Sequence, residues 1–324
     1  MAFIASQGNK VSSTVLITGG CGFIGTWVVR EALRRSLNVV VLDPGTPPAR
    51  WDRVLGKDVD SVVLEQGSLL DRDRLDQIFA THGITHVIHL AALLTPACQS
   101  DPWEGCQVNI LGTMAMLEAI RKHSGRIAGF SYASSVAVFG DEPDHALGET
   151  GGLLQPLTFY GAFKTSVELI AAQYWRHFNI ASLGIRPQVA YGPERDVGLT
   201  AGPSMAARAL AHGEPFTIGY RGRVGYDYVE DVATAFVRGA LETPQGAPVV
   251  DLAGPIATVE EVVEVLRELD PKAGAGISVS GGMIPSHAPP RPRFISELYP
   301  DWQTTSLLDG MRKTLEFYRG AITR

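Results

Sequence analysis

Tyr160 and Lys164, four positions apart, form the pair of residues in this chain best suited to acid–base chemistry. On a helix, residues four apart share one face, with Cβ atoms about 5 to 6 Å apart. A free phenol titrates near pH ~10, and a neighbouring ammonium favours its ionised form. The spacing therefore predicts that Lys164 lowers the pKa of Tyr160 towards neutral pH. The same spacing also occurs on solvated helix faces, so the surrounding chain must decide whether a redox cofactor is held nearby.

A glycine-rich turn near the start of the chain predicts such a cofactor site. A β-branched run at residues 15–18 leads into Gly-x-x-Gly-x-x-Gly, and helical apolar spacing follows at residues 27–33. Strand, glycine turn and helix in this order let the backbone approach a pyrophosphate, which the helix N-terminus then binds. The residues predicted to bind the cofactor here are Gly19, Gly22, Phe23, Ile24 and Gly25.

The residue at the end of the next predicted strand favours one cofactor over another. The strand at residues 38–42 is followed by Asp43, and Pro44 and Gly45 come next rather than an arginine. An acidic side chain at this point accepts hydrogen bonds from the adenosine ribose and repels a 2′-phosphate. We therefore predict NAD rather than NADP. Asp43 can also begin the Asp-Pro-Gly turn, and the two roles are compatible.

Strand and helix patterns alternate through the first half of the chain. Strands are expected at residues 61–66, 86–90 and 127–133, and helices at 72–81 and 103–123. This alternation predicts an α/β fold of Rossmann type, a doubly wound parallel sheet covered by helices on both faces. Ligands of such sheets lie beyond the carboxyl ends of the strands. The cofactor-binding residues predicted along this edge include Ser68, Leu69, Leu90, Ala91 and Ala92.

The composition excludes several classes of partner. The chain of 324 residues is 45% hydrophobic and carries a net charge of -6 with no run of lysines or arginines, so we expect a small-molecule substrate and neither nucleic acid nor membrane. No apolar stretch approaches the ~18 residues of a membrane span. The three cysteines have no metal-ligand spacing, and their odd number fits a reducing compartment. We therefore expect a cytoplasmic protein without a metal site.

Two reactive side chains are expected to be structural. His89 lies in an apolar strand with no second metal ligand at suitable spacing, which favours a hydrogen-bonded core histidine over a base or ligand. Cys98 has no cation near it in the sequence to activate a thiolate. Neither residue is predicted to take part in catalysis.

A series of motifs resembles the extended short-chain dehydrogenase/reductases, specifically the NAD-dependent epimerase/dehydratase family. In the family's order they are TGGCGFIG (18–25), Asp43, HLAA (89–92), NILGT (109–113), SSVAVFG (134–140), YGAFK (160–164), RP (186–187), YGP (191–193) and YVEDVA (228–233). The resemblance implies that Ser135, Tyr160 and Lys164 are catalytic. It further implies that Asn109 helps to hold the lysine region or the cofactor, and that Leu90, Ala91, Ala92 and Pro187 line the nicotinamide and its ribose.

The resemblance also implies how the chain is organised. Residues 1–187 are expected to form the NAD-binding Rossmann domain, and residues 188–324 mostly a smaller substrate-binding lobe. Part of the second segment, about 225–255, is expected to return to the Rossmann domain. The helices expected at 103–123 and 159–178 resemble those that build a four-helix homodimer interface in the family.

The chain departs from the family pattern at positions that handle nucleotide sugars. Residues 136–137 are Val-Ala where the 4,6-dehydratases carry Asp-Glu, so elimination of water is not expected. Val189 and Val224 stand where nucleotide-sugar enzymes commonly carry an asparagine and an arginine that bind the substrate diphosphate. Valine has no donor for a phosphate oxygen, although Arg221 and Arg223 lie close enough in sequence to compensate.

These departures favour an NAD-dependent dehydrogenase that acts on a secondary alcohol or hemiacetal of a non-nucleotide sugar, sugar acid or similar hydroxy compound. The alternative is a nucleotide-sugar 4-epimerase with tightly bound NAD, and a third possibility is a catalytically silent, NAD-sensing scaffold. Apart from Ser135, the candidate substrate-binding residues have polar side chains in segments expected near the pocket. The competing interpretation is that these segments are solvated and bind no substrate. The candidate residues are Thr95, Ser135, Arg195, Thr200, Arg223 and Arg291.

Overall fold

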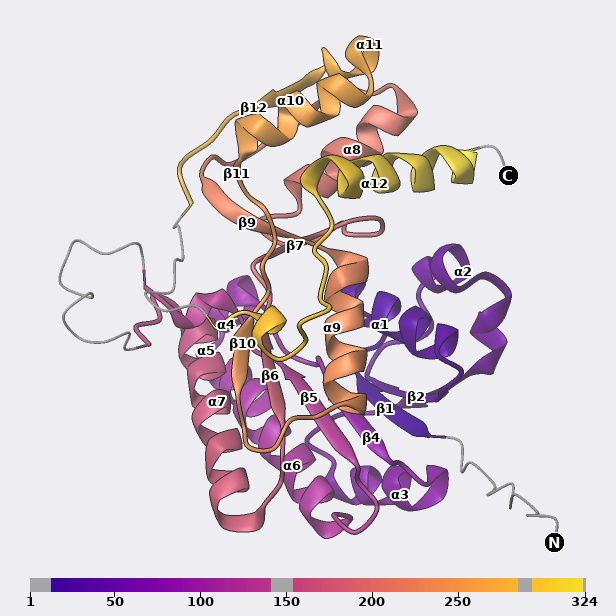
Figure 1. The fold of residues 1–324 in the computed structure, drawn as a ribbon, viewed down its shortest axis with the longest axis vertical. Coiled ribbons are helices and arrows are strands. Elements are labelled where there is room, and N and C mark those ends of the chain that lie inside the picture. The colour runs from indigo at the N-terminus through magenta and orange to yellow at the C-terminus, as the bar shows by residue number, and fades with distance from the viewer. Residues whose placement is uncertain (1–12, 141–153, 285–292, 323–324) are drawn as a thin grey trace, which may run out of the picture.

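A parallel sheet of seven strands organises the larger part of the molecule (Figure 1). The computed structural model describes residues 13–140, 154–284 and 293–322. The strand order is β10-β6-β5-β4-β1-β2-β3, and β1 in the centre pairs in parallel with both β2 and β4. This arrangement confirms the predicted α/β fold of Rossmann type. The strands are β1 (Thr14–Thr18), β2 (Asn38–Asp43), β3 (Val62–Gln66), β4 (His86–His89), β5 (Gly129–Ala133), β6 (Leu183–Arg186) and β10 (Val249–Asp251).

Alternating side chains of the strands build a core on each face of this sheet. In β1, Val15 and Ile17 pack into one buried cluster, and Leu16 between them packs into the other. Because successive residues of a strand point to opposite faces, both sides must be covered when all five residues of β1 are buried. Helices α1 (Phe23–Arg34) and α9 (Val229–Leu241) cover the first face, and α3 (Arg72–His82), α6 (Gly112–Lys122) and α7 (Phe159–Phe178) cover the second.

A second group of elements forms the upper part of the molecule in Figure 1. Its strands form a three-stranded sheet, β11-β9-β7, and a two-stranded sheet, β12-β8. From β9 the chain passes directly into α9 on the large sheet and then into its edge strand β10. The elements are β7 (Val189–Tyr191), α8 (Gly202–His212), β8 (Phe216–Ile218), β9 (Arg223–Tyr228), β11 (Ile256–Thr258), α10 (Val259–Leu269), α11 (Pro271–Gly274), β12 (Ile277–Val279) and α12 (Leu307–Ile322).

The single long helix predicted at residues 103–123 is interrupted. Helix α5 (Pro102–Cys106) runs into a π-helical turn, η2 (Gln107–Leu111), before α6 begins. A π-helical turn inserts one extra residue and is common at functional sites. Sequence periodicity does not reveal such a turn, because the apolar spacing on either side of it stays helical. The remaining short helices are α2 (Ala49–Leu55), η1 (Gly56–Ser61), α4 (Thr95–Ser100), η3 (Val136–Val138) and η4 (Ile295–Glu297).

Among the residues that the structure describes, no helix has the length and apolar character needed to cross a membrane.

Candidate active site

Two of the three Gly-x-x-Gly-x-x-Gly glycines between β1 and α1 leave no room for a side chain. A Cβ atom at Gly25 would lie 2.1 Å from the carbonyl oxygen of Gly19. Gly19 itself has a φ of +73°, and a Cβ there would lie 2.9 Å from the Ala91 backbone. Helix α1 begins at Phe23 without a capping side chain or an acidic residue in its first turn. No side chain caps the positive end of α1, which fits the pyrophosphate of a dinucleotide.

Asp43 links the end of β2 to this turn. Its Oδ2 accepts a hydrogen bond of 3.1 Å from the Cys21 N–H, and its Oδ1 accepts one of 2.9 Å from the Gly45 N–H. The second bond shows that Asp43 does begin the Asp-Pro-Gly turn. A carboxylate has lone pairs for further donors, so these bonds are compatible with the predicted contact to the adenosine ribose.

His89 is a core histidine, as predicted. Its Nδ1 lies 2.7 Å from Thr18 Oγ1 and its Nε2 lies 2.9 Å from Thr113 Oγ1. Burial, helped by the Lys164 charge, lowers the pKa of His89 to about 3, so the ring is neutral. Thr18 Oγ1 also accepts from the backbone N–H groups of Leu90 and Ala91, both at 3.2 Å. His89 therefore helps to orient the segment that is predicted to line the nicotinamide.

Asn109 holds the loop after β4 rather than the lysine. From the π-helical turn, its Oδ1 accepts from the Leu93 N–H at 2.7 Å and its Nδ2 donates to the Leu93 carbonyl at 3.0 Å. The same Nδ2 lies 3.4 Å from Cys98 Sγ. The residue is only 2% exposed, so these bonds satisfy a buried amide. Asn109 thus acts on the predicted cofactor-lining segment indirectly, through its bonds to Leu93.

Ser135, Tyr160 and Lys164 meet at the carboxyl end of β5. Helix α7 begins beside them, where the Thr158 side chain caps it by accepting from the Gly161 N–H at 3.0 Å. The Tyr160 phenol is hydrogen-bonded to the Ser135 side chain. Lys164 Nζ lies 5.6 Å from the centre of the Tyr160 ring and donates to the Ala133 carbonyl at 2.6 Å. The fold thus assembles the three side chains that the sequence singled out.

The predicted lowering of the Tyr160 pKa by Lys164 is not seen. Burial raises the pKa of Tyr160 to about 12, and the hydrogen bond from Ser135 opposes this shift. Burial also lowers the pKa of Lys164 to about 8. The reason is geometric: the ammonium is aimed at the Ala133 carbonyl, and burial acts on both members of the pair. In this structure Ser135, not Lys164, is the group that favours the phenolate.

Cys98 lies close to Lys164 and Tyr160 in the fold, which its neighbours in the sequence do not indicate. The Lys164 charge favours the thiolate form of Cys98, and a thiolate there would in turn raise the pKa of Tyr160. The thiol is fully buried and lies 3.3 Å from the Leu93 carbonyl. Burial raises the pKa of Cys98, so the thiol stays protonated and structural despite the nearby cation.

Glu168, one turn after Lys164, is a buried residue that the sequence reasoning missed. Its Oε1 accepts from Ser134 Oγ and from Arg186 Nε, the latter at 2.7 Å, and its Oε2 accepts from Arg186 Nη2 at 2.6 Å. Arg186 Nη1 lies 3.8 Å from Asp251 Oδ1 at the end of β10. The sequence signal that could have found Glu168 is its spacing of four residues from Lys164, which places both on one face of a helix. The network joins the ends of β5, β6 and β10 directly behind the catalytic candidates.

The remaining cofactor candidates occupy the same edge of the sheet with different exposures. Ser68 is exposed and its Oγ accepts from the Leu70 N–H at 3.2 Å, whereas Leu69 is buried and packs beside Gly112. Pro187 is buried, and its carbonyl accepts from the Val136 N–H at 3.4 Å. This last bond links the loops that follow β5 and β6.

The candidate substrate residues belong to several different elements. Arg195 and Thr200 are brought together, with Arg195 Nη2 donating to Thr200 Oγ1 at 2.7 Å. Thr95 is the first residue of α4 and is partly buried, and Arg223 is exposed on β9. Arg291 lies outside the described residues.

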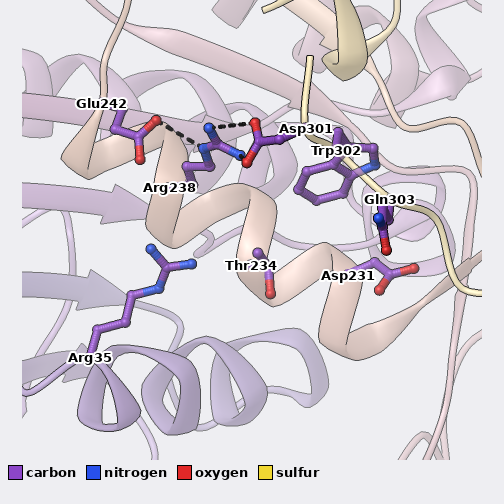
Figure 2. Close-up of a pocket in the computed structure, with 8 residues that line it drawn as sticks. All are labelled: Arg35, Asp231, Thr234, Arg238, Glu242, Asp301, Trp302 and Gln303. Carbon is purple, nitrogen blue, oxygen red and sulfur yellow. Dashed lines mark hydrogen bonds and ion pairs between the residues drawn. The ribbon is translucent and has the colours of Figure 1, made fainter. Parts of the chain in front are cut away.

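A polar cavity of about 450 Å³ lies away from all of these residues, on the outer side of α9 (Figure 2). Arg238 in its wall pairs with Glu242 and Asp301, both at 2.9 Å. None of the predicted site residues lines it. Its walls are formed by Arg35, Asp231, Thr234, Arg238, Glu242, Asp301, Trp302 and Gln303. Within the described parts of the chain, no cluster of three or more metal-ligating side chains occurs either.

Comparison with known proteins accounts for this arrangement. The sequence model of the NAD dependent epimerase/dehydratase family matches residues 15–251, from the first strand to the last strand of the large sheet. The chain belongs to the NAD-dependent epimerase/dehydratase family. The family's cofactor is NAD, and the glycine turn with Asp43 beside it fits that molecule.

The similar members of the family are largely sugar epimerases. A UDP-glucose 4-epimerase of Yersinia pestis is 30% identical over 72% of this chain and 75% of that protein. One of Erwinia amylovora is 35% identical, but over only 50% of this chain and 48% of that protein. The solved UDP-glucose 4-epimerase of Thermus thermophilus, in complex with NAD, has 27% identity and a TM-score of 0.76 and covers 95% of this chain and 99% of its own.

Proposed function

We propose that this protein is an NAD-dependent 4-epimerase of a nucleotide sugar. The observation that carries the proposal is the similarity to UDP-glucose 4-epimerases at 30% identity across most of the chain, combined with an assembled set of Ser135, Tyr160 and Lys164. This function corresponds to the alternative interpretation of the sequence. The preferred sequence interpretation, a dehydrogenase of non-nucleotide sugars, rested on the two missing diphosphate ligands and is supported less well by these relatives.

The geometry supports a proton-relay role for each member of the set. Ser135 hydrogen-bonds to the Tyr160 phenol and can hold a substrate hydroxyl against it. In its ionised form, which the Ser135 contact favours and burial opposes, Tyr160 would take the proton from that hydroxyl and later return it. Lys164 is fixed by the Ala133 carbonyl beside the tyrosine ring, where a ribose hydroxyl can also reach it. NAD, when bound, supplies the hydride acceptor and donor.

Epimerisation follows if the substrate turns over between the two hydride steps. The hydride taken from the sugar carbon would return to the opposite face of that carbon, and the proton would return to its oxygen, so no net NADH would form. A dehydrogenase would instead release the oxidised sugar and accumulate NADH. The same three side chains serve both reactions, and the difference lies in how the substrate is held.

The experiment that separates them uses purified protein with UDP-glucose, UDP-galactose and a panel of free sugars and hydroxy acids. We expect interconversion of a UDP-sugar pair, detected by anion-exchange chromatography, without net NADH absorbance. Steady NADH formation with a free sugar, and no epimer from any UDP-sugar, would establish the dehydrogenase. Absence of both reactions in protein that still binds NAD would favour a silent scaffold.

A further inference from the structure

The loop after β7 carries alternating charges that fix the direction of its arginine. Glu194 accepts two hydrogen bonds from Arg53, at 2.8 and 2.6 Å, and Asp196 accepts two from Arg50, at 3.0 and 3.1 Å. Both arginines belong to α2, so these two ion pairs anchor the loop to that helix. Arg195 lies between the two acids and takes no part in either pair. The Arg195 side chain is therefore left to make contacts other than these two ion pairs.

The Arg195 guanidinium lies between β7 and the glycine turn. It donates to the Ala190 carbonyl and to Thr200 Oγ1, and its Cζ is 6.0 Å from the centre of the Phe23 ring, at the start of α1. Tyr220 and, on β9, Tyr226 are both close enough to influence its charge. Burial lowers the pKa of Arg195 to about 10, which leaves it protonated at neutral pH. No carboxylate of the described residues forms an ion pair with it.

This position coincides with the place where the sequence lacks its expected phosphate ligands. Ala190, which accepts from Arg195, directly follows Val189 on β7. Tyr226 pairs with Val189 in the sheet and comes two residues after Val224 on β9. The arginine therefore rests against the same two strands that carry the two valines.

One of the two basic residues that sequence proximity offered as substitutes, Arg221, is engaged elsewhere. Arg221 pairs with Glu260 on α10 and also donates to the Val279 carbonyl at 3.3 Å. Its side chain is 44% exposed. Arg221 is thus held on the outer side of the second group of elements by a partner of its own.

We propose that Arg195 binds a phosphate group beside β7, in place of the asparagine and arginine that nucleotide-sugar enzymes commonly carry at positions 189 and 224. A partly buried cation without a counter-ion is costly, and a phosphate both neutralises it and accepts its remaining N–H donors in pairs. The phosphate can come from the diphosphate of a nucleotide sugar or from the pyrophosphate of NAD. The proposal rests on the proposed function as far as the first source is concerned.

The test compares the Arg195→Met variant with Arg221→Met as a matched control. UDP affinity is measured by titration calorimetry, and NAD content is measured after gel filtration. A charge-assisted hydrogen bond contributes about 1.5 to 3 kcal/mol, so R195M should lose roughly 10- to 150-fold in affinity for its phosphate ligand. R221M should keep wild-type affinity for UDP and wild-type NAD content.

The two sources give different results. Weaker UDP binding with unchanged NAD content assigns Arg195 to the substrate diphosphate, and loss of NAD with unchanged UDP binding assigns it to the cofactor. Wild-type binding of both by a folded R195M variant would overturn the proposal. If R195M does not fold, Thr200→Val removes only one anchor of the guanidinium and should still weaken phosphate binding several-fold. Failure of the wild type to bind UDP at all would instead count against the proposed epimerase. The NAD content of R195M would then decide whether Arg195 binds a phosphate.

Discussion

Lys164 donates a 2.6 Å hydrogen bond to the carbonyl oxygen of Ala133, at the carboxyl end of β5. This bond fixes a buried ammonium at the edge of the sheet, 5.6 Å from the centre of the Tyr160 ring. Even so, the pKa of Tyr160 is raised rather than lowered, contrary to what their spacing on α7 suggests. The Ser135 hydroxyl, on the segment that follows β5, makes the direct contact with the phenol. The proposed catalytic set thus depends as much on the end of this strand as on the helix.

Replacement of Tyr160 by phenylalanine should abolish proton transfer while leaving the fold intact. We expect turnover to fall roughly 10²- to 10⁴-fold, the usual contribution of a positioned acid–base group, with NAD content nearly unchanged. Tyr174→Phe on the same helix is the control, because that hydroxyl bonds to Glu118 and not to the site. A Y160F rate equal to the wild type would show that another residue transfers the proton.

Gly25→Ala should disrupt the cofactor turn. The new methyl group would lie 2.1 Å from the Gly19 carbonyl, so the backbone must shift, at a cost of about 3 kcal/mol. Thermal denaturation should show a lower Tm, and gel filtration should show loss of NAD. Gly125→Ala, where no atom lies within 4 Å of the new methyl group, should retain both. Equal Tm values for the two variants would contradict the close packing of this turn.

Asn109→Ala should loosen the loop after β4. The variant leaves the N–H and the carbonyl of Leu93 without their partner, and each unsatisfied group costs about 1 to 3 kcal/mol where it is buried. We expect a lower Tm together with weaker NAD binding, measured by calorimetry, because the same loop is predicted to line the nicotinamide. A lower Tm with unchanged NAD affinity would restrict Asn109 to a role in stability.

Asp251→Asn should change the way in which stability depends on pH. Burial raises the pKa of Asp251 from 3.8 to about 6, although the Arg186 charge opposes the shift. The folded state therefore holds a proton that the unfolded state releases. The contribution of Asp251 to stability is complete below pH ~4 and is lost as the pH rises through about 6.

The asparagine cannot ionise, so the stability of D251N relative to wild type should increase through this same window. The difference above pH ~7 should be at most about 3 kcal/mol in favour of the variant, measured by urea denaturation at a series of pH values. A difference that stays constant between pH 4 and 7 would show that Asp251 titrates normally in the folded protein.

Exposed apolar side chains on the α5–α6 segment and on α7 predict a homodimer. Leu111 and Leu169 are 48% and 59% exposed, and Trp103, Met114 and Phe178 add to the same helices. Burying such side chains against a second copy is favourable, and two helices from each subunit would form a four-helix interface. Light scattering should show a dimer for the wild type and a monomer for a Leu111→Glu, Leu169→Glu double variant. Val197→Glu, an exposed position on the loop after β7, should remain dimeric.

Local patterns in the sequence determined the parts of this protein that rest on short-range geometry. The strand–glycine–helix order gave the cofactor turn, because only glycine leaves room for the close approach of Gly19 and Gly25. The alternation of strands and helices predicted the parallel sheet and its ligand-binding edge, and the ordered motifs identified the family. The spacing of Tyr160 and Lys164 correctly predicted that they share a helix face at that edge.

The tertiary structure decided what depends on contacts between distant segments. Burial and the bond to Ala133 set the protonation of Lys164, and the proximity of Cys98 to that lysine arises only when α4 packs against α7. The pairing of Arg221 with Glu260, and the direction of Arg195 towards β7 and the glycine turn, likewise depend on which partners the fold brings near. Charges and hydrogen bonds act through space over a few ångströms, and neighbours at that range are set by packing rather than by position along the chain.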